Sequence, residues 1–240
     1  MQKKMLVLSH AACKGHAPEN TLAGIRAALA IGADAVEVDV RATADGVPVL
    51  LHDPTVDRTT DGSGLLAAMT LSEAQKLNAG DERFPGERVP SLEEAVQTAG
   101  EMALFLELKE TGIERAVLDV IERTGAMERC TINSFLGDAL SAMRRLEPRL
   151  PCVLTVAGRP ADWDELLTRA LELYAQGLSV ECSLVDAALV EKTLRRAMRV
   201  YSWTVNDGRE MQRLIALGVD GIISDYPDRV LRALGRGPSS

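Results

Sequence analysis

The sequence is poor in aromatic residues, histidine and cysteine. Only 3% of its 240 residues are Phe, Tyr or Trp, and it contains three histidines and four cysteines. The cysteines are scattered, and no two of them have the spacing of a zinc finger. A chain of this length can bury most of its apolar surface, so it needs neither disulfides nor a structural metal. Cys13 is the thiol closest to the histidines, and we expect it to have no chemical role.

Long hydrophobic runs and excess positive charge are also missing. No segment approaches the ~20 apolar residues of a membrane-spanning helix, and the apolar run after the basic start MQKK is too short for a signal peptide. The net charge of −8 disfavours nucleic acid or an anionic membrane as the main partner. We therefore expect a soluble cytoplasmic protein with reduced thiols, no nucleic-acid partner and no stable membrane insertion. The sequence leaves assembly into a homo-oligomer open.

Short apolar segments alternate with amphipathic segments along most of the chain, which predicts alternating strands and helices. Eight strands are predicted, at Met5–Ser9, Ala35–Arg41, Ala103–Lys109, Cys130–Ser134, Cys152–Val156, Leu178–Cys182, Val200–Val205 and Gly221–Ser224. Helices are predicted after them at Thr21–Ile31, Ser91–Ala99, Ile113–Thr124, Leu136–Leu146, Trp163–Tyr174, Asp186–Ala197, Arg209–Leu217 and Asp228–Leu234. Eight such units predict an α/β fold, a closed (β/α)8 TIM barrel. The alternative is an open doubly wound sheet, but no GxGxxG follows the first strand.

One segment interrupts the alternation after the second strand. The Asp-Gly turn at 45–46 is too short for a parallel crossover, so residues 47–52 are predicted to return antiparallel. This return brings His52 and Asp53 back beside Glu37 and Asp39. The turn-rich sequence that follows predicts a small inserted subdomain in the second βα loop, where barrels place functional structure. We expect one domain over residues 1–234, an insertion at about 46–88 and a disordered tail at 235–240.

Charged residues gather at the predicted carboxyl ends of the strands, where TIM barrels place their active sites. Glu37 and Asp39 are two residues apart and therefore share one face of a strand, as do Glu107 and Lys109. Three carboxylates at one barrel mouth need a countercharge. A hard divalent cation such as Mg²⁺ or Ca²⁺, which prefers carboxylate oxygens, would supply it. The same rim is expected to carry His10, His52, Trp203, Asn206 and Asp225.

Each of these residues alone has an ordinary structural explanation, such as an ion pair inside the barrel or a hydrogen-bonded core histidine. Their convergence on one rim favours a catalytic site instead. Two histidines beside a carboxylate-bound cation indicate a general acid and a general base. Lys109 adds a positive charge for an anionic oxygen.

With these motifs in place, the sequence resembles the glycerophosphodiester phosphodiesterase family, from residue 7 to about 230. The matching motifs are His10, APENT at 17–21, EVDV at 37–40, ADGVPVLLHD at 44–53, DRTTDGSG at 57–64, VPSLEEA at 89–95, LELK at 106–109, SF at 134–135, WTVND at 203–207 and GVDGIISDYPD at 218–228. Each motif is weak alone, but the ordered set is specific.

The resemblance implies a TIM barrel that hydrolyses glycerophosphodiesters to an alcohol and glycerol 3-phosphate with a divalent metal ion, Mg²⁺ or Ca²⁺. It also implies roles for side chains at the barrel mouth: Glu37, Asp39 and Glu107 as metal ligands, His10 and His52 as acid and base, and Lys109 as a phosphate contact. Trp203 would offer an apolar wall for the glycerol carbons. Asn20 is expected to cap the first helix, and His16 to be an ordinary loop residue.

The chain departs from the family in the first motif. The family sequence His-Arg-Gly, whose arginine contacts phosphate, reads His10-Ala11-Ala12 here. Losing the charge-assisted hydrogen bonds from such an arginine to the phosphate costs on the order of 1.5–3 kcal/mol of binding free energy. Three explanations are open: Lys14 or Arg41 supplies the charge, the natural substrate differs, or the enzyme is weakened. The alternatives to the first reading are therefore the same chemistry on a lysophospholipid or sugar-phosphate diester, and a weakened or non-catalytic phosphodiester-binding homologue.

Overall fold

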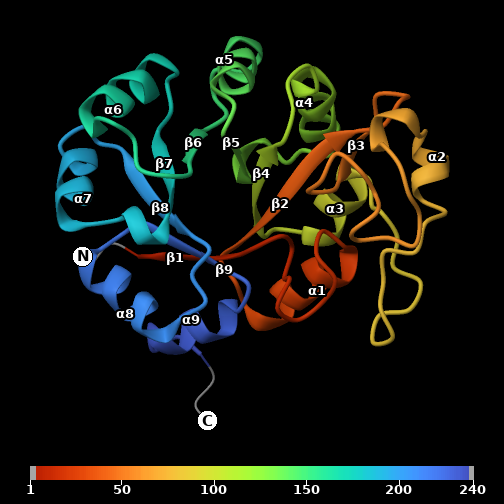
Figure 1. The fold of residues 1–240 in the computed structure, drawn as a ribbon, viewed down its shortest axis with the longest axis horizontal. Helices are drawn as coiled ribbons and strands as arrows, with labels where there is room; N and C mark the ends of the chain where they lie inside the picture. The colour runs from red at the N-terminus through yellow and green to blue at the C-terminus, as the bar shows by residue number, and fades with distance from the viewer. Residues whose placement is uncertain (1–3, 238–240) are drawn as a thin grey trace.

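Strand pairing closes the sheet into a ring. In this computed structural model, which describes residues 4–237, eight parallel strands pair in the order β1-β9-β8-β7-β6-β5-β4-β2, and β1 pairs with β2 to complete the barrel (Figure 1). The strands are β1 (Leu6–Ser9), β2 (Ala35–Ala42), β4 (Ala103–Leu108), β5 (Cys130–Ser134), β6 (Cys152–Val156), β7 (Gly177–Glu181), β8 (Arg199–Trp203) and β9 (Gly221–Ser224). The predicted TIM barrel is confirmed, and the open doubly wound sheet is excluded.

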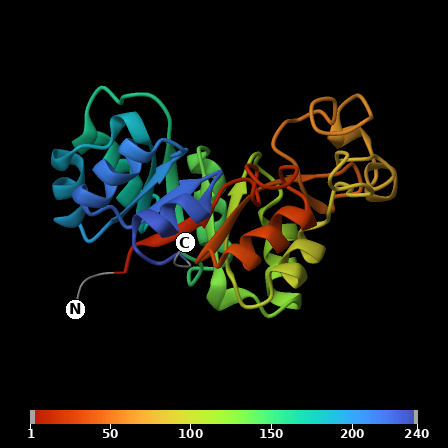
Figure 2. The ribbon, with the colours of Figure 1, turned by 90° about the horizontal axis from the view of Figure 1, so that it is seen from below.

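A helix follows each barrel strand and lies on the outside of the ring (Figures 1 and 2). These helices are α1 (Leu22–Ile31), α3 (Leu92–Ala99), α4 (Glu114–Arg123), α5 (Gly137–Leu146), α6 (Trp163–Glu172), α7 (Ala187–Leu194), α8 (Gly208–Leu217) and α9 (Pro227–Ala233). Every predicted strand and helix is present, with ends displaced by a few residues. Gly32 ends α1 in the left-handed conformation, which a residue without a Cβ adopts at no steric cost. Within residues 4–237, no helix has the length and apolar content needed to cross a membrane.

The connection after β2 carries the insertion. Strand β3 (Pro48–Leu50) pairs antiparallel with β2, as predicted, with Val40 opposite Leu50. The insertion then runs through η1 (Leu66–Ala68) and α2 (Leu71–Ala74), which lie to one side of the barrel (Figures 1 and 2). It has an apolar cluster of its own, made of Val49, Leu51, Val56, Leu66, Ala74 and Val89. Two more short helices, η2 (Met127–Arg129) and η3 (Cys182–Leu184), lie next to barrel strands.

The division of the chain into one domain over residues 1–234 and a disordered tail over 235–240 stays a prediction. Residues 1–3 and 238–240 lie outside the described residues. Within the described part, the Arg236 side chain donates to a carboxylate oxygen of Asp34 and to the carbonyl oxygen of Met5.

The inside of the barrel is filled by an apolar layer. Side chains alternate along a strand, so Val36, Val38 and Val40 of β2 pack outward against the helices, whereas Glu37 and Asp39 face inward. Beneath those two acids lies a layer that we call the plug, made of Leu8, Ala35, Phe105, Val153, Tyr201 and Ile223. The plug closes the barrel below the acidic residues, so ligands approach from the carboxyl ends of the strands.

Phe105 is expected to be important for stability because its ring packs edge-to-face on Tyr201, with ring centroids 5.0 Å apart. Truncation of a buried aromatic side chain leaves a cavity, so F105A should lower the free energy of unfolding by about 3–5 kcal/mol. Urea denaturation followed by circular dichroism measures this loss. L194A removes a mostly exposed side chain and should change the stability by less than about 0.5 kcal/mol. A similar small effect for F105A would contradict a packed plug.

Candidate active site

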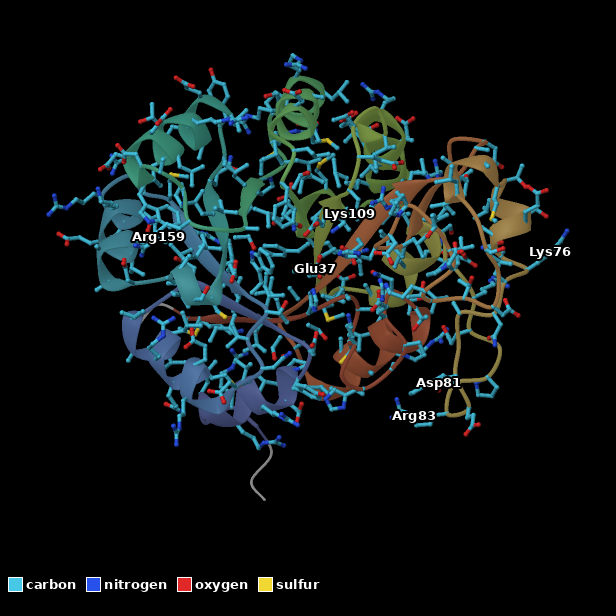
Figure 3. All side chains as sticks on the ribbon, in the orientation of Figure 1. Glu37, Lys76, Asp81, Arg83, Lys109 and Arg159 are labelled. Atoms are coloured by element: carbon cyan, nitrogen blue, oxygen red, sulfur yellow. The ribbon has the colours of Figure 1, made fainter. Side chains whose placement is uncertain are left out.

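A cavity of about 260 Å³ opens at the carboxyl ends of the barrel strands, above the plug. The structure brings together all of the side chains that the sequence predicted for the site: His10, Glu37, Asp39, His52, Glu107, Lys109 and Trp203. Figure 3 shows Glu37 and Lys109 pointing into the centre of the ring. What these groups do chemically depends on their partners and their burial.

Three carboxylates form the acidic side of the cavity. Asp39 lies opposite Glu107 in the β2–β4 pairing, and oxygens of Glu37, Asp39 and Glu107 all lie within 4.8 Å of one another. All three side chains are buried. Burial, reinforced by the charge of Asp39, raises the pKa of Glu37 to about 8. Ionising all three carboxyl groups at once is therefore unfavourable without a countercharge.

The contacts of this cluster show how the charge is partly compensated. Lys109 lies within ion-pair distance of Asp39 (3.2 Å) and also contacts Glu107. The backbone N–H of Ala11 donates to Glu37 (2.9 Å), and burial raises the pKa of Glu107 despite Lys109. One ammonium group among three carboxylates leaves room for a divalent cation. An all-oxygen donor set suits a hard ion such as Mg²⁺ or Ca²⁺, so the residues fit a metal ion.

His10 is held at the end of β1 by a half-buried acid, Asp225. Its Nδ1 donates to Oδ1 of Asp225 (2.6 Å), and Asn206 donates to the other oxygen of Asp225 (2.7 Å). Burial opposes the charged imidazole, but the bond to Asp225 and the charge of Glu37 raise its pKa from 6.5 to about 9. Because Nδ1 is engaged, Nε2 is the nitrogen left for a ligand in the cavity.

His52 is held in the same way by the insertion. Its Nδ1 lies 2.7 Å from Oδ1 of Asp53, and Arg58 donates to the other oxygen of Asp53. Arg58 also donates to Glu19 (2.6 Å), which pairs with Lys14 (2.9 Å). The bond from Arg58 lowers the pKa of Asp53 to about 2. This chain of side chains joins the insertion to the loop after β1 and fixes the orientation of His52.

The role of Asn20 was predicted wrongly. The N-cap of α1 is Thr21, whose hydroxyl accepts from the N–H of Gly24. Asn20 precedes the cap in a left-handed conformation (φ 55°), so its side chain turns inward. Its amide donates to Asp39 (2.7 Å) and accepts from the N–H of Asp39 (3.1 Å). Asn20 thus orients a carboxylate of the acidic cluster.

The departure from the family motif can now be located. Ala11 and Ala12 are buried and both adopt positive φ (44° and 69°). Neither cation considered as a substitute lines the cavity. Arg41 donates to Glu110 and to the carbonyl oxygen of His52, while Lys14 pairs with Glu19. Lys109 is the cation that lines the cavity in the described part of the chain.

Other residues near the mouth were missed or set aside by sequence reasoning. Phe135 lines the cavity with its ring centroid 5.6 Å from that of Trp203, and the two rings form an apolar wall. Asp53 and Arg58 were recognised as motif residues but received no role. His16, as expected, stays out of the cavity and pairs with Asp228 (2.8 Å). The sequence did offer a signal for Asp53 and Arg58, because the acid directly follows a histidine and the arginine comes five residues later.

Comparison with known proteins gives a consistent picture. The model of the "Glycerophosphoryl diester phosphodiesterase family" matches residues 10–229. A glycerophosphodiester phosphodiesterase of Caldanaerobacter subterraneus is 35% identical over 98% of this chain and 99% of its own length. Mouse glycerophosphodiester phosphodiesterase 1 is 33% identical, over 85% of this chain and 72% of its own. A phosphodiesterase of Oleispira antarctica, solved in complex with the product sn-glycerol-3-phosphate, superposes with a TM-score of 0.90 at 32% identity, over 96% of each chain.

The acidic cluster predicts cation binding that depends on pH. The pKa of Glu37 is raised from 4.5 to about 8, so the metal-free fold holds a proton there that the unfolded chain loses. The stability that this proton on Glu37 contributes to the metal-free fold is complete below about pH 4.5 and is lost as the pH rises to about 8. A cation must displace this proton at pH 5 but not above pH 8. Mg²⁺ or Ca²⁺ should therefore raise the melting temperature more at pH 8.5 than at pH 5.

Thermal unfolding with and without each cation measures this effect. E37Q, D39N and E107Q should each remove most of the stabilisation, because each deletes a charged ligand. Glu101 is exposed and distant from the cavity, so E101Q should respond to cations as the unaltered chain does. Equal stabilisation of all four variants would mean that the cations bind elsewhere.

Proposed function

Because the chain belongs to the glycerophosphoryl diester phosphodiesterase family and is therefore a phosphodiesterase, we propose that its barrel mouth hydrolyses glycerophosphodiesters to an alcohol and glycerol 3-phosphate. The observation that carries the proposal is the convergence of one acidic cluster and two aspartate-paired histidines on a single cavity. The product bound to the Oleispira antarctica relative supports a small-molecule phosphate ester as the ligand.

In this proposal Glu37, Asp39 and Glu107 hold one divalent cation, Mg²⁺ or Ca²⁺. The cation, when bound, polarises a phosphoryl oxygen. The ammonium group of Lys109, now shared between Asp39 and Glu107, neutralises charge on the phosphate once the cation satisfies those carboxylates. The backbone N–H of Ala11 and the amide of Asn20 hold two of the ligands in place.

The two histidines move protons at opposite ends of the reaction. One imidazole removes a proton from the attacking hydroxyl. That hydroxyl is either a water or the glycerol 2-hydroxyl, whose attack gives a cyclic phosphate that a water then opens to glycerol 3-phosphate. The other imidazole protonates the leaving alkoxide. Asp225 and Asp53 fix the two rings through Nδ1, so each ring presents Nε2 to the substrate.

The shape of the cavity supports a small soluble diester. A volume of about 260 Å³ accommodates a glycerol phosphate but not a buried acyl chain, and the wall of Phe135 and Trp203 suits the glycerol carbons. A lysophospholipid is therefore less well matched. The intact acidic cluster and both His–Asp pairs also argue against a protein that binds without turnover.

A cytoplasmic location is part of the same proposal. It is supported by four free cysteines, of which Cys13, Cys130 and Cys152 are buried in the reduced state. The acidic net charge agrees with a small-molecule partner rather than a nucleic acid.

H10A and H52A should each lower kcat on glycerophosphocholine by about 10²–10⁴-fold, the usual range for acid–base groups. Neither ring contributes a ligand in this proposal, so both variants should keep the thermal stabilisation by cations. Release of glycerol 3-phosphate, measured with and without EDTA, gives the rates. H16A is the matched control, because His16 lies outside the cavity. Near-full turnover by H10A or H52A would refute the role of that residue.

Asp225 allows the acid and the base to be told apart. D225N removes the carboxylate that raises the pKa of His10, so the limb of the pH–rate profile that belongs to His10 should move to lower pH. A shift of the alkaline limb identifies His10 as the acid, and a shift of the acidic limb identifies it as the base. If neither limb moves in D225N, His10 does not set the profile.

A11R should raise kcat/KM on glycerophosphodiesters by about ten- to a hundredfold, which corresponds to a recovered interaction of about 1.5–3 kcal/mol. The reason is that the two candidate substitutes, Lys14 and Arg41, are paired outside the cavity. A11M adds comparable bulk without charge and should give no gain. If A11R gives no gain on glycerophosphocholine or on a diester without glycerol, the missing arginine–phosphate hydrogen bonds are not what limits this enzyme.

A further inference from the structure

His52 lies just beyond the end of a strand, at the point where the barrel passes into the insertion. Strand β3 ends at Leu50, and the N–H of Leu51 still donates to the carbonyl oxygen of Asp39 in β2 (3.0 Å). His52 comes next, and its side chain is 48% exposed. The contact that continues the attachment to the barrel at His52 comes from a side chain.

The side chain that reaches His52 from the barrel is Arg41. Its Nε donates to the carbonyl oxygen of His52 (2.9 Å), and its Nη1 donates to a carboxylate oxygen of Glu110 (3.0 Å). The other oxygen of Glu110 accepts from the N–H of Ala42 (2.9 Å). Arg41 belongs to β2, two residues after Asp39, and Glu110 follows β4. The main chain of His52 is therefore tied to the rim of the barrel.

This tie is better suited to fixing a position than the bonds made within the insertion. The side chain of Arg41 is 13% exposed, whereas that of Arg58 is 47% exposed, and exposed ion pairs contribute little. A guanidinium group holds its donors in a planar fork, so bonds to two separate partners fix its orientation. Asp53 is the chain neighbour of His52, so their bond orients the ring without attaching the segment to the barrel.

We propose that Arg41 is a positioning residue, which fixes the main chain of His52 at the rim and thereby sets the place of its imidazole above the acidic cluster. The inference rests on the function proposed above, in which His52 transfers a proton. Proton transfer requires heavy atoms about 2.6–3.2 Å apart, and a misplacement of about 1 Å can cost on the order of a hundredfold in rate. Arg41 does not line the cavity, so it acts through His52 and not on the substrate.

The test is a double-mutant cycle with glycerophosphocholine and Mg²⁺, in which release of glycerol 3-phosphate gives the rates. R41M cannot bond the carbonyl oxygen and should lower kcat by about ten- to a hundredfold, with a change in KM of less than about twofold. In H52A the proton-transfer group is already missing. Adding R41M to H52A should therefore lower kcat by less than about a further twofold, because the two changes remove the same contribution.

Two more variants complete the test. R115M removes an arginine from the exposed pair with Asp119 on α4 and should leave kcat unchanged in both backgrounds. R41K keeps a charge beside Glu110 but not the planar fork, so it should keep the fold and still lose about three- to tenfold in kcat, the effect of one hydrogen bond. Thermal stabilisation by Mg²⁺ should be the same in R41M, R41K and the unaltered chain, since the bonds of Arg41 go to Glu110 and His52.

The outcomes separate this inference from the function on which it rests. If R41M lowers kcat by the same factor with and without His52, acts mainly on KM, or keeps full turnover, Arg41 does not position His52, although hydrolysis still stands. The inference is also wrong if both R41M and R41K fail to fold, since the arginine then serves stability. If the unaltered protein releases no glycerol 3-phosphate, or if H52A keeps full turnover, the proposed function itself fails at that step.

Discussion

The structure depends on the burial of three carboxylates side by side. Glu37, Asp39 and Glu107 are placed together by β2 and β4, and their repulsion works against folding in the absence of a cation. The surrounding groups reduce that cost. The backbone N–H of Ala11, the amide of Asn20 and the ammonium group of Lys109 each contact one or two of the acids. The metal ion that we propose for this cluster would therefore find its ligands already in position.

This constraint also explains the layering of the barrel. A strand alternates its side chains between two faces, so β2 can supply valines to the outer core and acids to the cavity from one short segment. The plug of Phe105, Tyr201 and their neighbours keeps the lower barrel apolar and leaves the charge at the mouth. Stability and chemistry are thus assigned to different layers of the same strands.

The sequence was most informative where local rules determine geometry. The two-residue spacing of Glu37 and Asp39 placed both acids on one face, and the Asp-Gly turn returned His52 to the site. Hydrogen bonds between residues far apart in the sequence could not be predicted from such local rules. His10 and Asp225 are 215 positions apart, and Arg58 and Glu19 are 39 apart. Only the closure of the barrel and the folding of the insertion bring them together.

The wrong prediction for Asn20 had a different cause. Asn20 precedes a helix and has the residue type of a cap, but its left-handed backbone turns the side chain toward Asp39.

The way in which His52 is held has a consequence for how the enzyme fails. The acidic cluster and His10 belong to barrel strands or their ends, whereas His52 depends on Asp53 and Arg58 of an insertion with its own small apolar cluster. Proteins open in local units, and a peripheral unit opens at a lower free energy than the core. Opening of the insertion would displace His52, the proposed proton-transfer group, while the acidic cluster of the barrel persists. Heat or denaturant would then inactivate the protein in a partial transition, before the barrel itself unfolds.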